Sequence, residues 1–350
     1  MTHAPDRLFI INHCLDLDDP ILSHQASTVL ELAKHFHLVT VLTGRLGNFV
    51  APPNVQIIST GWNPGSDLWN GFNTLRLGIL NLIKLRPDVV FTHMADLQAA
   101  LLAPVIRFLR IRHVFWYAHA HSSKFLKFAN LFVNVLVSST HGSMPLKSRK
   151  VRLIGQSIDI TLFKSSKVNV NKRGKYLHVG RIDSSKQIGL ICEAYLKVFR
   201  DDNESSLTFI GSSSNPKSKS YQSQIYSQYH NAISAGKINF LAAVPRTSLP
   251  EIYSSFDVFI HAFIGSLDKT LLEATAVGLP VVTINPEYES EFGIWSRVDS
   301  RSPSLEEELA AFLRLDVDEI SGEINRRTKI VSQFHSQELW ISKLLSLLTE

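Results

Sequence analysis

Hydrophobic and polar positions along the chain repeat one arrangement, in which a short apolar run is followed by a longer segment of mixed polarity. The run RLFIIN at 7–12 is the first, and SHQASTVLELAKHF at 23–36 follows it with apolar residues at helical spacing. Nearly continuous apolar runs are typical of parallel strands that are covered on both faces. We therefore expect a buried strand at 7–12 and an amphipathic helix at 23–36, with Ser23 as its N-cap.

The same alternation of apolar runs and helical segments continues through the first half of the chain. Further strands are predicted from apolar runs at 38–44, 55–59, 88–93, 112–119 and 131–139. Strands that alternate with helices favour a doubly wound parallel sheet. The first half is thus expected to form one Rossmann-like α/β domain.

A polar and basic segment without helical periodicity, FKSSKVNVNKRGK at 163–175, interrupts this pattern. We expect a first domain at 1–165, a linker at 166–175 and a second Rossmann-like domain at 176–330. The second domain is predicted from strands at 176–181, 206–212, 238–244, 256–263 and 280–285 and from helices at 189–200 and 269–277. Two such domains that face each other place a ligand cleft between the carboxyl ends of their sheets. The remaining segment, 331–350, predicts a helix that packs back on the first domain.

Length and composition agree with two globular domains. The 350 residues exceed the roughly 250–300 at which a single core stops growing. Two cysteines, Cys14 and Cys192, can make neither a disulfide framework nor a cysteine-based zinc module, and they favour a reducing compartment. The absence of a signal peptide and of a long apolar segment predicts a cytoplasmic location. No metal is expected, because the 14 histidines show no ligand pair at helical spacing beside a carboxylate.

The net charge of +5 is distributed unevenly. The segment 97–158 contains no acidic residue but nine basic ones, namely Arg107, Arg110, Arg112, Lys124, Lys127, Lys147, Arg149, Lys150 and Arg152. A positive electrostatic field attracts phosphorylated ligands or anionic lipid, so peripheral contact with an anionic membrane is one interpretation. A solvated basic face is the alternative. Nucleic acid is not expected, because no nucleic-acid-binding motif accompanies the charge.

The segment GRIDSSKQ at 180–187 directly follows a predicted strand and precedes a helix. Gly180 permits a tight turn where the backbone approaches a ligand. Arg181 and Lys186 then place two cations near a helix N-terminus, which together form an anion site suited to a diphosphate. A surface turn with solvated charges is the alternative that this pattern leaves open.

A second segment, IGSLDKTLLEATAVGLPVV at 264–282, contains a helix with clear boundaries. Asp268 is expected to cap its N-terminus, and Gly278 with Pro280 to end it. Glu273 is flanked by apolar residues, so its carboxylate is expected to be partly buried and to need a partner. A ribose diol fits that need, and a structural Arg or Lys is the alternative. The first backbone amides of the helix point toward any anion in the cleft.

These two segments, in this order and spacing, resemble the retaining GT-B glycosyltransferases of family four, the glycosyl transferases group 1. The resemblance extends over nearly the whole chain. It includes FWYAHAH ending at 121, IGQSIDITLF at 154–163, TFIGS at 208–212, INFLAAVPRTSLPEIYSSFDVFI at 238–260 and QFHSQELW ending at 340. The resemblance implies the GT-B fold, with an acceptor-binding first domain and a donor-binding second domain.

The resemblance also implies an activity and a set of site residues. The expected reaction is metal-independent transfer of a hexose, with retention, from a nucleotide-diphosphate sugar to a saccharide or lipid-linked saccharide. The pathway it implies is polysaccharide or cell-envelope glycan biosynthesis, with no cofactor. The matching residues are Arg181 and Lys186 for the diphosphate, Glu273 for the ribose, Gly180, Gly211 and Ser212 in the turns, Val244 beside the base, Asp268, Lys269, Thr270 and Leu271 at the helix start, and His119 near the reacting sugar. His24, His93 and His121 are further candidates for the acceptor side.

One position departs from the family pattern. The first Glu of the Glu-x7-Glu motif would fall at 265, where this chain has Gly265, and Asp268 or Lys269 is expected to take its place. This departure supports a second hypothesis, a non-catalytic homologue that binds nucleotide sugars, which the intact Arg181, Lys186 and Glu273 oppose. A dinucleotide-dependent oxidoreductase or an epimerase is disfavoured, because the first strand is followed by no G-x-G-x-x-G.

Overall fold

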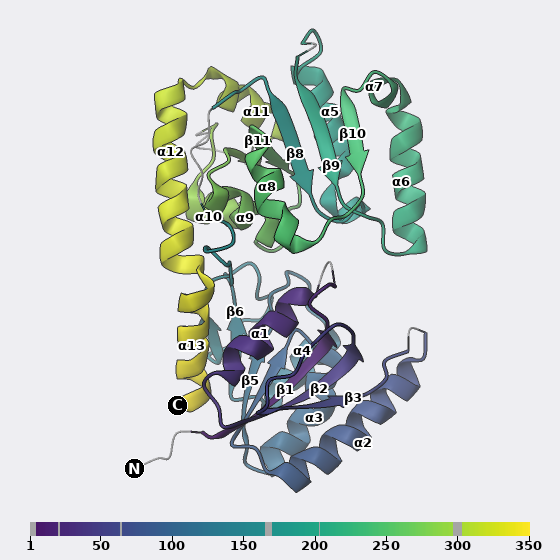
Figure 1. The fold of residues 1–350 in the computed structure, drawn as a ribbon, viewed down its shortest axis with the longest axis vertical. Helices are drawn as coiled ribbons and strands as arrows, with labels where there is room; N and C mark the ends of the chain where they lie inside the picture. The colour runs from purple at the N-terminus through teal and green to yellow at the C-terminus, as the bar shows by residue number, and fades with distance from the viewer. Residues whose placement is uncertain (1–4, 20–21, 64, 165–169, 203, 297–302) are drawn as a thin grey trace. The chain divides into compact units, whose positions relative to one another are not determined.

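The computed structural model describes residues 5–19, 22–63, 65–164, 170–202, 204–296 and 303–350 (Figure 1). The chain forms two compact units. We call Met1–Gly155 with Glu338–Glu350 the N-terminal unit, and Gln156–Gln337 the C-terminal unit. The domain boundary predicted at 165 lies later in the chain than this division, and part of the predicted linker lies outside the described residues.

The N-terminal unit is built on a parallel sheet with the strand order β3-β2-β1-β4-β5-β6-β7. Because the order reverses between β1 and β4, the ends of these two strands define the switch point of this sheet. The predicted doubly wound fold is confirmed. The strands are β1 (Arg7–Leu15), β2 (Leu38–Leu46), β3 (Val55–Ser59), β4 (Val89–His93), β5 (Arg112–Trp116), β6 (Val135–Ser138) and β7 (Val151–Leu153).

Helices cover both faces of this sheet. They are α1 (Ser23–Ala33), α2 (Asp67–Leu85), α3 (Asp96–Phe108), α4 (Lys124–Phe132) and, from the chain's end, α13 (Gln337–Thr349). Trp340 of α13 meets Trp116 edge to face, with ring centroids 5.0 Å apart, inside the core that α1 shares with the strands. The prediction for Ser23 is wrong, because Leu22 occupies the N-cap position and makes no side-chain cap. Instead Asp19 fixes the preceding turn by accepting a hydrogen bond from the Leu22 amide at 2.7 Å.

The C-terminal unit contains a second parallel sheet, with the order β10-β9-β8-β11-β12. Its strands are β8 (Lys175–Val179), β9 (Ser206–Ile210), β10 (Ile238–Leu241), β11 (Val258–His261) and β12 (Val281–Thr283). The order reverses between β8 and β11, so the switch point of this sheet lies between the segments that follow those two strands.

Helix α9 (Lys269–Val277) is the buried helix of this unit. It packs against α8 (Leu249–Ser254), α12 (Val317–Ile330) and the π-helical turn η3 (Val331–His335), and all of its residues from Leu271 to Val277 are buried. Gly278 ends it in the left-handed region with φ 97°, as predicted. The other helices are η1 (Ser184–Lys186), α5 (Ile188–Val198), α6 (Pro216–Gln228), α7 (His230–Ser234), η2 (Arg246–Ser248), α10 (Pro286–Phe292) and α11 (Leu305–Arg314).

Candidate functional site

The segments that follow β8 and β11 meet at the switch point of the C-terminal unit. Lys186, in the short helix η1 after β8, forms an ion pair with Asp268, the residue that precedes α9. His261, at the end of β11, contacts the same carboxylate, with Nε2 3.2 Å from Oδ2. The two segments singled out from the sequence are therefore joined by a direct contact.

The charges at this contact are strongly coupled. Lys186 is buried, and its ammonium lies 4.2 Å from the centre of the Phe263 ring. Burial alone would raise the pKa of Asp268, but the charge of Lys186 and the contacts with His261 outweigh it and hold that pKa well below its usual range. Asp268 is thus an anion that is already paired with Lys186, the cation predicted to bind a diphosphate.

The prediction that Asp268 caps α9 is wrong in one respect. Asp268 occupies the N-cap position with extended backbone, but its side chain makes no cap hydrogen bond because Lys186 and His261 hold it. Within the described part of the chain, the buried Thr270 hydroxyl has no hydrogen-bond partner. The first turn of α9 therefore keeps donors available for an anion.

Glycines shape the turns beside this site. A side chain at Gly211 would collide with the carbonyl oxygen of Gly180, so the two turns approach as closely as only glycine allows. Their backbones are linked, since the Gly180 amide donates to Ile210 and the Ser212 carbonyl accepts from Ile182, both at 3.0 Å. Arg181 projects from this turn with 47% of its side chain exposed and its Nη1 3.4 Å from Asp183. Its guanidinium is accessible to a ligand.

Glu273 is buried, as the sequence predicts, and its partner is an arginine. Arg246 donates two hydrogen bonds to the Oε1 atom of Glu273, from Nη2 at 2.7 Å and from Nε at 3.1 Å. Burial raises the pKa of Glu273, while Arg246 and Lys269 counteract the rise. Of the two partners left open by the sequence, the structure contains the arginine, and the ribose contact stays a prediction.

Two neighbours of Glu273 were also candidates from the sequence. Burial and the charge of Arg246 lower the pKa of the half-buried Lys269 to about 7. Val244 is half-buried and packs on the core beside α9, in the loop that leads to Arg246. This corner thus contains two cations around a single carboxylate, which leaves a net positive charge when all three are ionised.

The departure at position 265 has a structural explanation. A side chain built on Gly265 would overlap the ring of Phe263, which lies across the space where it would begin. Phe263 also contacts the Lys186 ammonium. An aromatic ring therefore fills the place at which the family pattern has a carboxylate.

Gln156, within the segment IGQSIDITLF at 154–163, is buried in the C-terminal unit. Its side-chain amide donates to the Leu267 carbonyl at 2.9 Å, and its backbone amide donates to Nδ1 of His335 at 3.1 Å. These bonds fix the loop directly before Asp268.

The four candidate histidines lie in the N-terminal unit, in two pairs. His24 of α1 and His93 of β4 stack edge to face with centroids 5.3 Å apart, beside the switch point between β1 and β4. His119 and His121 follow β5, where the His121 amide donates to Nδ1 of His119 at 3.0 Å. The structure brings each pair together, and their catalytic and acceptor roles stay predictions.

Sequence reasoning missed Arg246, His261 and Phe263. Arg246 follows VP in a loop without periodicity, and its partner Glu273 is 27 residues away. His261 and Phe263 read only as the end of a strand. Their alternation with the buried Ile260 and Ala262 was the available signal that both side chains share one face.

Two features are absent from the described residues. No group of three or more His, Cys, Asp or Glu side chains in that part of the chain is placed to hold a metal ion. No helix among the described residues is long and apolar enough to cross a membrane.

Comparison with known proteins agrees with this architecture. Anabaena HepE in complex with UDP-glucose aligns over 97% of this chain and 99% of its own, with TM-score 0.73 and 15% identity. Sucrose-phosphate synthase from Thermosynechococcus elongatus aligns over 98% of both chains, with TM-score 0.76 and 13% identity. The lipopolysaccharide outer core galactosyltransferase WaaB aligns over 97% of this chain and 98% of its own, with TM-score 0.68 and 10% identity. At these identities the likeness shows the fold, and no curated protein matches by sequence.

The two parallel sheets and their topology give this chain the fold of the GT-B glycosyltransferases. Residues 159–292 match the family model described as glycosyl transferases group 1, so the chain carries a domain of that family. The resemblance drawn from the sequence is confirmed.

Proposed function

We propose that this enzyme transfers a hexose from a uridine-diphosphate sugar to a saccharide or lipid-linked saccharide, with retention and without a metal ion. The observation that carries the proposal is the meeting of Lys186 with the start of α9 at the switch point, beside the exposed Arg181. The uridine nucleotide is supported by HepE, a similar fold whose complex holds UDP-glucose.

The fixed positive charge suits a departing diphosphate. As the bond between the anomeric carbon and the diphosphate oxygen breaks, negative charge grows on the β-phosphate. Lys186, Arg181 and the amides of α9 supply donors for that charge. Because Asp268 now pairs with Lys186, a bound diphosphate shares or takes over this ammonium, and His261 stays in contact with the carboxylate.

Retention follows if the acceptor attacks from the face that the diphosphate leaves. One bond forms, from the acceptor oxygen to the anomeric carbon, and one breaks, from that carbon to the diphosphate oxygen. The acceptor's hydroxyl proton passes to a β-phosphate oxygen, so no protein base is required. We propose that His119 orients the reacting sugar and that Glu273, held by Arg246, accepts hydrogen bonds from the ribose.

A thermal-shift series tests the donor site. UDP at about 100 times its dissociation constant is expected to stabilise the protein by roughly 2.7 kcal/mol. Lys186→Ala and Glu273→Ala are expected to reduce the UDP shift, whereas Lys217→Ala, an exposed lysine of α6, serves as the matched control. GDP, ADP and TDP test the base. A folded wild type that responds to none of these nucleotides would overturn the proposal in favour of a homologue without this activity.

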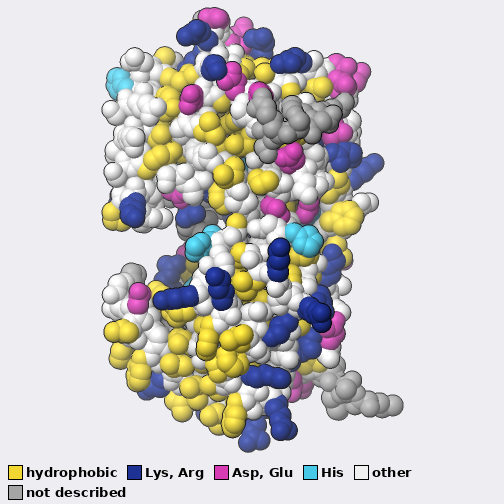
Figure 2. Space-filling model, turned by 180° about the vertical axis from the view of Figure 1, so that it is seen from behind, with side chains coloured by type: hydrophobic (Ala, Val, Ile, Leu, Met, Phe, Trp, Pro, Cys, Tyr) yellow, Lys and Arg dark blue, Asp and Glu magenta, His cyan; other side chains and the backbone are white. Residues whose placement is uncertain are grey.

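The lipid-linked acceptor is supported by the surface of the N-terminal unit. Helices α2, α3 and α4 lie side by side there, and Phe108, Phe128 and Leu131 are exposed on α3 and α4. Figure 2 shows hydrophobic side chains interspersed with Lys and Arg over this unit, the lower part of the view. Apolar side chains among basic ones suit the interface of an anionic membrane. We propose that the enzyme works there, on the cytoplasmic face, in cell-envelope or polysaccharide glycan synthesis.

Co-sedimentation with vesicles tests this contact. Binding to phosphatidylglycerol vesicles is expected, with weaker binding at high salt and none to phosphatidylcholine. Phe108→Asp is expected to abolish it, and Val50→Asp, at an equally exposed apolar position of the same unit, is expected to preserve it. Equal binding to both vesicle types would contradict the membrane proposal while leaving the donor site untouched.

A further inference from the structure

Helix α2 exposes apolar side chains in addition to those that it packs on the core. Its fully buried positions, Asn70, Asn73, Thr74, Gly78 and Leu82, are mostly polar or small, and Leu75, Leu77, Ile79 and Leu85 pack on the core half-buried. Its outer side exposes Leu68, Trp69, Phe72, Leu80 and Ile83, and Leu68 is 92% exposed. An apolar face that points away from the core indicates a binding surface.

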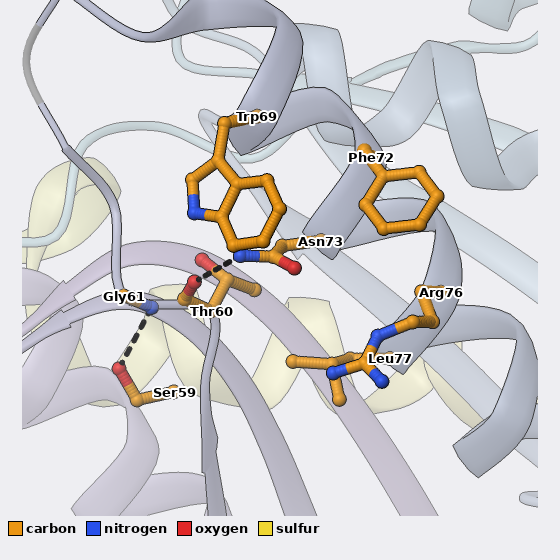
Figure 3. A pocket seen from close by; sticks show the side chains of 8 residues that line it. All are labelled: Ser59, Thr60, Gly61, Trp69, Phe72, Asn73, Arg76 and Leu77. Carbon is orange, nitrogen blue, oxygen red and sulfur yellow. Dashed lines mark hydrogen bonds between the residues drawn. The ribbon is translucent and has the colours of Figure 1, made fainter.

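A pocket of about 500 Å³ opens beside the first half of this helix (Figure 3). One wall is formed by Ser59, Thr60 and Gly61, directly after β3, and the other by α2 residues that include Trp69, Phe72 and Arg76. The volume is within the range of small-ligand sites. The pocket also lies at the carboxyl edge of a parallel sheet, where such folds bind ligands.

The pocket combines aromatic rings with polar groups. Trp69 and Phe72 are stacked with centroids 6.0 Å apart, and both are more than half exposed. Between them and the strand end, the buried Asn73 donates to the Thr60 carbonyl at 3.3 Å. The buried Thr60 hydroxyl has no hydrogen-bond partner among the described residues. A ligand hydroxyl group would satisfy it.

Arg76 supplies the charge of the pocket. It is exposed, and across the described parts of the chain no acidic side chain pairs with it and no hydrogen bond engages it. A guanidinium offers two parallel donors, which match a carboxylate or a phosphate group.

We propose that this pocket binds one sugar residue of the acceptor, and that this sugar carries an acidic group. The apolar face of the ring packs on Trp69 and Phe72, a hydroxyl bonds the Thr60 side chain, and the carboxylate or phosphate group binds Arg76. The assignment of this ligand to the acceptor rests on the proposed function.

Two other occupants fit the pocket less well. An acyl chain or an apolar protein surface would offer a hydrogen-bond partner neither to the Thr60 hydroxyl, which is already buried and unpaired among the described residues, nor to the Arg76 guanidinium. Symmetric pairing with a second copy would bring two Arg76 guanidinium groups toward each other without an acid to compensate them. A sugar with an acidic group satisfies the aromatic, hydroxyl and guanidinium groups together.

Saturation-transfer NMR with the full-length protein tests the proposal. The probes are methyl β-glucuronide, glucose 6-phosphate and neutral methyl β-glucoside, which separate a carboxylate from a phosphate group and both from no charge. The variants are Trp69→Ala and Arg76→Gln. Leu80→Ala, at an exposed apolar position further along α2, is the matched control. All four proteins are also tested for the UDP thermal shift and for vesicle binding.

Tighter binding of an acidic probe than of the neutral glucoside is the expected result. Trp69→Ala should weaken every probe about tenfold. Arg76→Gln should weaken only the acidic ones, and Leu80→Ala none. The inference is overturned if the wild type binds no probe, if Trp69→Ala leaves sugar binding unchanged, or if the variants lose vesicle binding alone. A wild type that binds the probes but shows no UDP shift would refute the proposed function and leave the sugar site standing.

Discussion

Replacing Arg246 with alanine leaves the Glu273 carboxylate, whose side chain is only 4% exposed, without the two hydrogen bonds it accepts. Removing one partner of a buried ion pair costs about 3–5 kcal/mol. Here the Arg246 side chain is 25% exposed and Lys269 stays nearby, so we expect a loss of about 2–3 kcal/mol. In a unit of this size that loss lowers Tm by about 4–12 °C.

The loss of stability caused by Arg246→Ala should depend on pH. Burial raises the pKa of Glu273, and the loss of Arg246 raises it further. A carboxyl group whose pKa is higher in the folded than in the unfolded protein destabilises the fold above that pKa, and the cost disappears as it becomes protonated. The difference in stability between wild type and Arg246→Ala is therefore expected to be larger at pH 8 than at pH 5.

Urea unfolding, followed by circular dichroism at both pH values, measures this difference. Arg173→Ala is the matched control, since that arginine pairs with Asp202 at the surface and should contribute at most about 1 kcal/mol. The double variant Arg246→Ala/Glu273→Gln should recover part of the loss. The reasoning is refuted if Arg246→Ala costs no more than Arg173→Ala, or if its cost is the same at both pH values.

Three further predictions follow from the same structure. Gly265→Glu should destabilise the protein by about 1–3 kcal/mol, because its side chain overlaps the Phe263 ring, and an unchanged Tm would contradict this. Burial and Arg246 lower the pKa of Lys269 to about 7, so this lysine loses its charge as pH rises through that value. The affinity for UDP, measured by calorimetry, should fall over that range, and a Lys269→Met variant with the same pH dependence would contradict the assignment. Leu344→Ala should cost about 2–5 kcal/mol in urea unfolding, since that side chain is fully buried in the N-terminal unit, and a loss below 1 kcal/mol would argue against its place in the core.

Sequence patterns correctly predicted the elements whose ends are marked by clear helix-stop residues. The helix at 269–277 has the predicted bounds, because Gly278 and Pro280 end it unambiguously. The predicted strand at 131–139 was wrong in its first part, since α4 extends to Phe132 and β6 begins at Val135. One apolar run crosses that helix–strand boundary, and periodicity cannot divide such a run.

The candidate site was predictable only where residues that are neighbours in the sequence determine its geometry. The turn at Arg181 and Lys186 follows from the succession of strand, glycine and helix. Asp268 was expected to cap its own helix, but the tertiary contact with Lys186 competes for the same oxygens. Arg246 was missed because the contact depends on how a loop without periodicity folds over α9. The sugar pocket beside α2 required knowledge of which face of that helix is exposed.

The return of the chain's last residues to the first unit has a consequence for biosynthesis. Trp340 and its neighbours in α13 complete a core whose other members lie between residues 8 and 154. A ribosome that adds about 5–20 residues per second needs roughly 10–40 s to make the chain from Gly155 to the end. Throughout that interval the nascent first unit exposes the apolar surface that α13 later covers. This unit is therefore a natural client for chaperones on the ribosome, and a premature stop before residue 338 leaves it without the segment that closes its core.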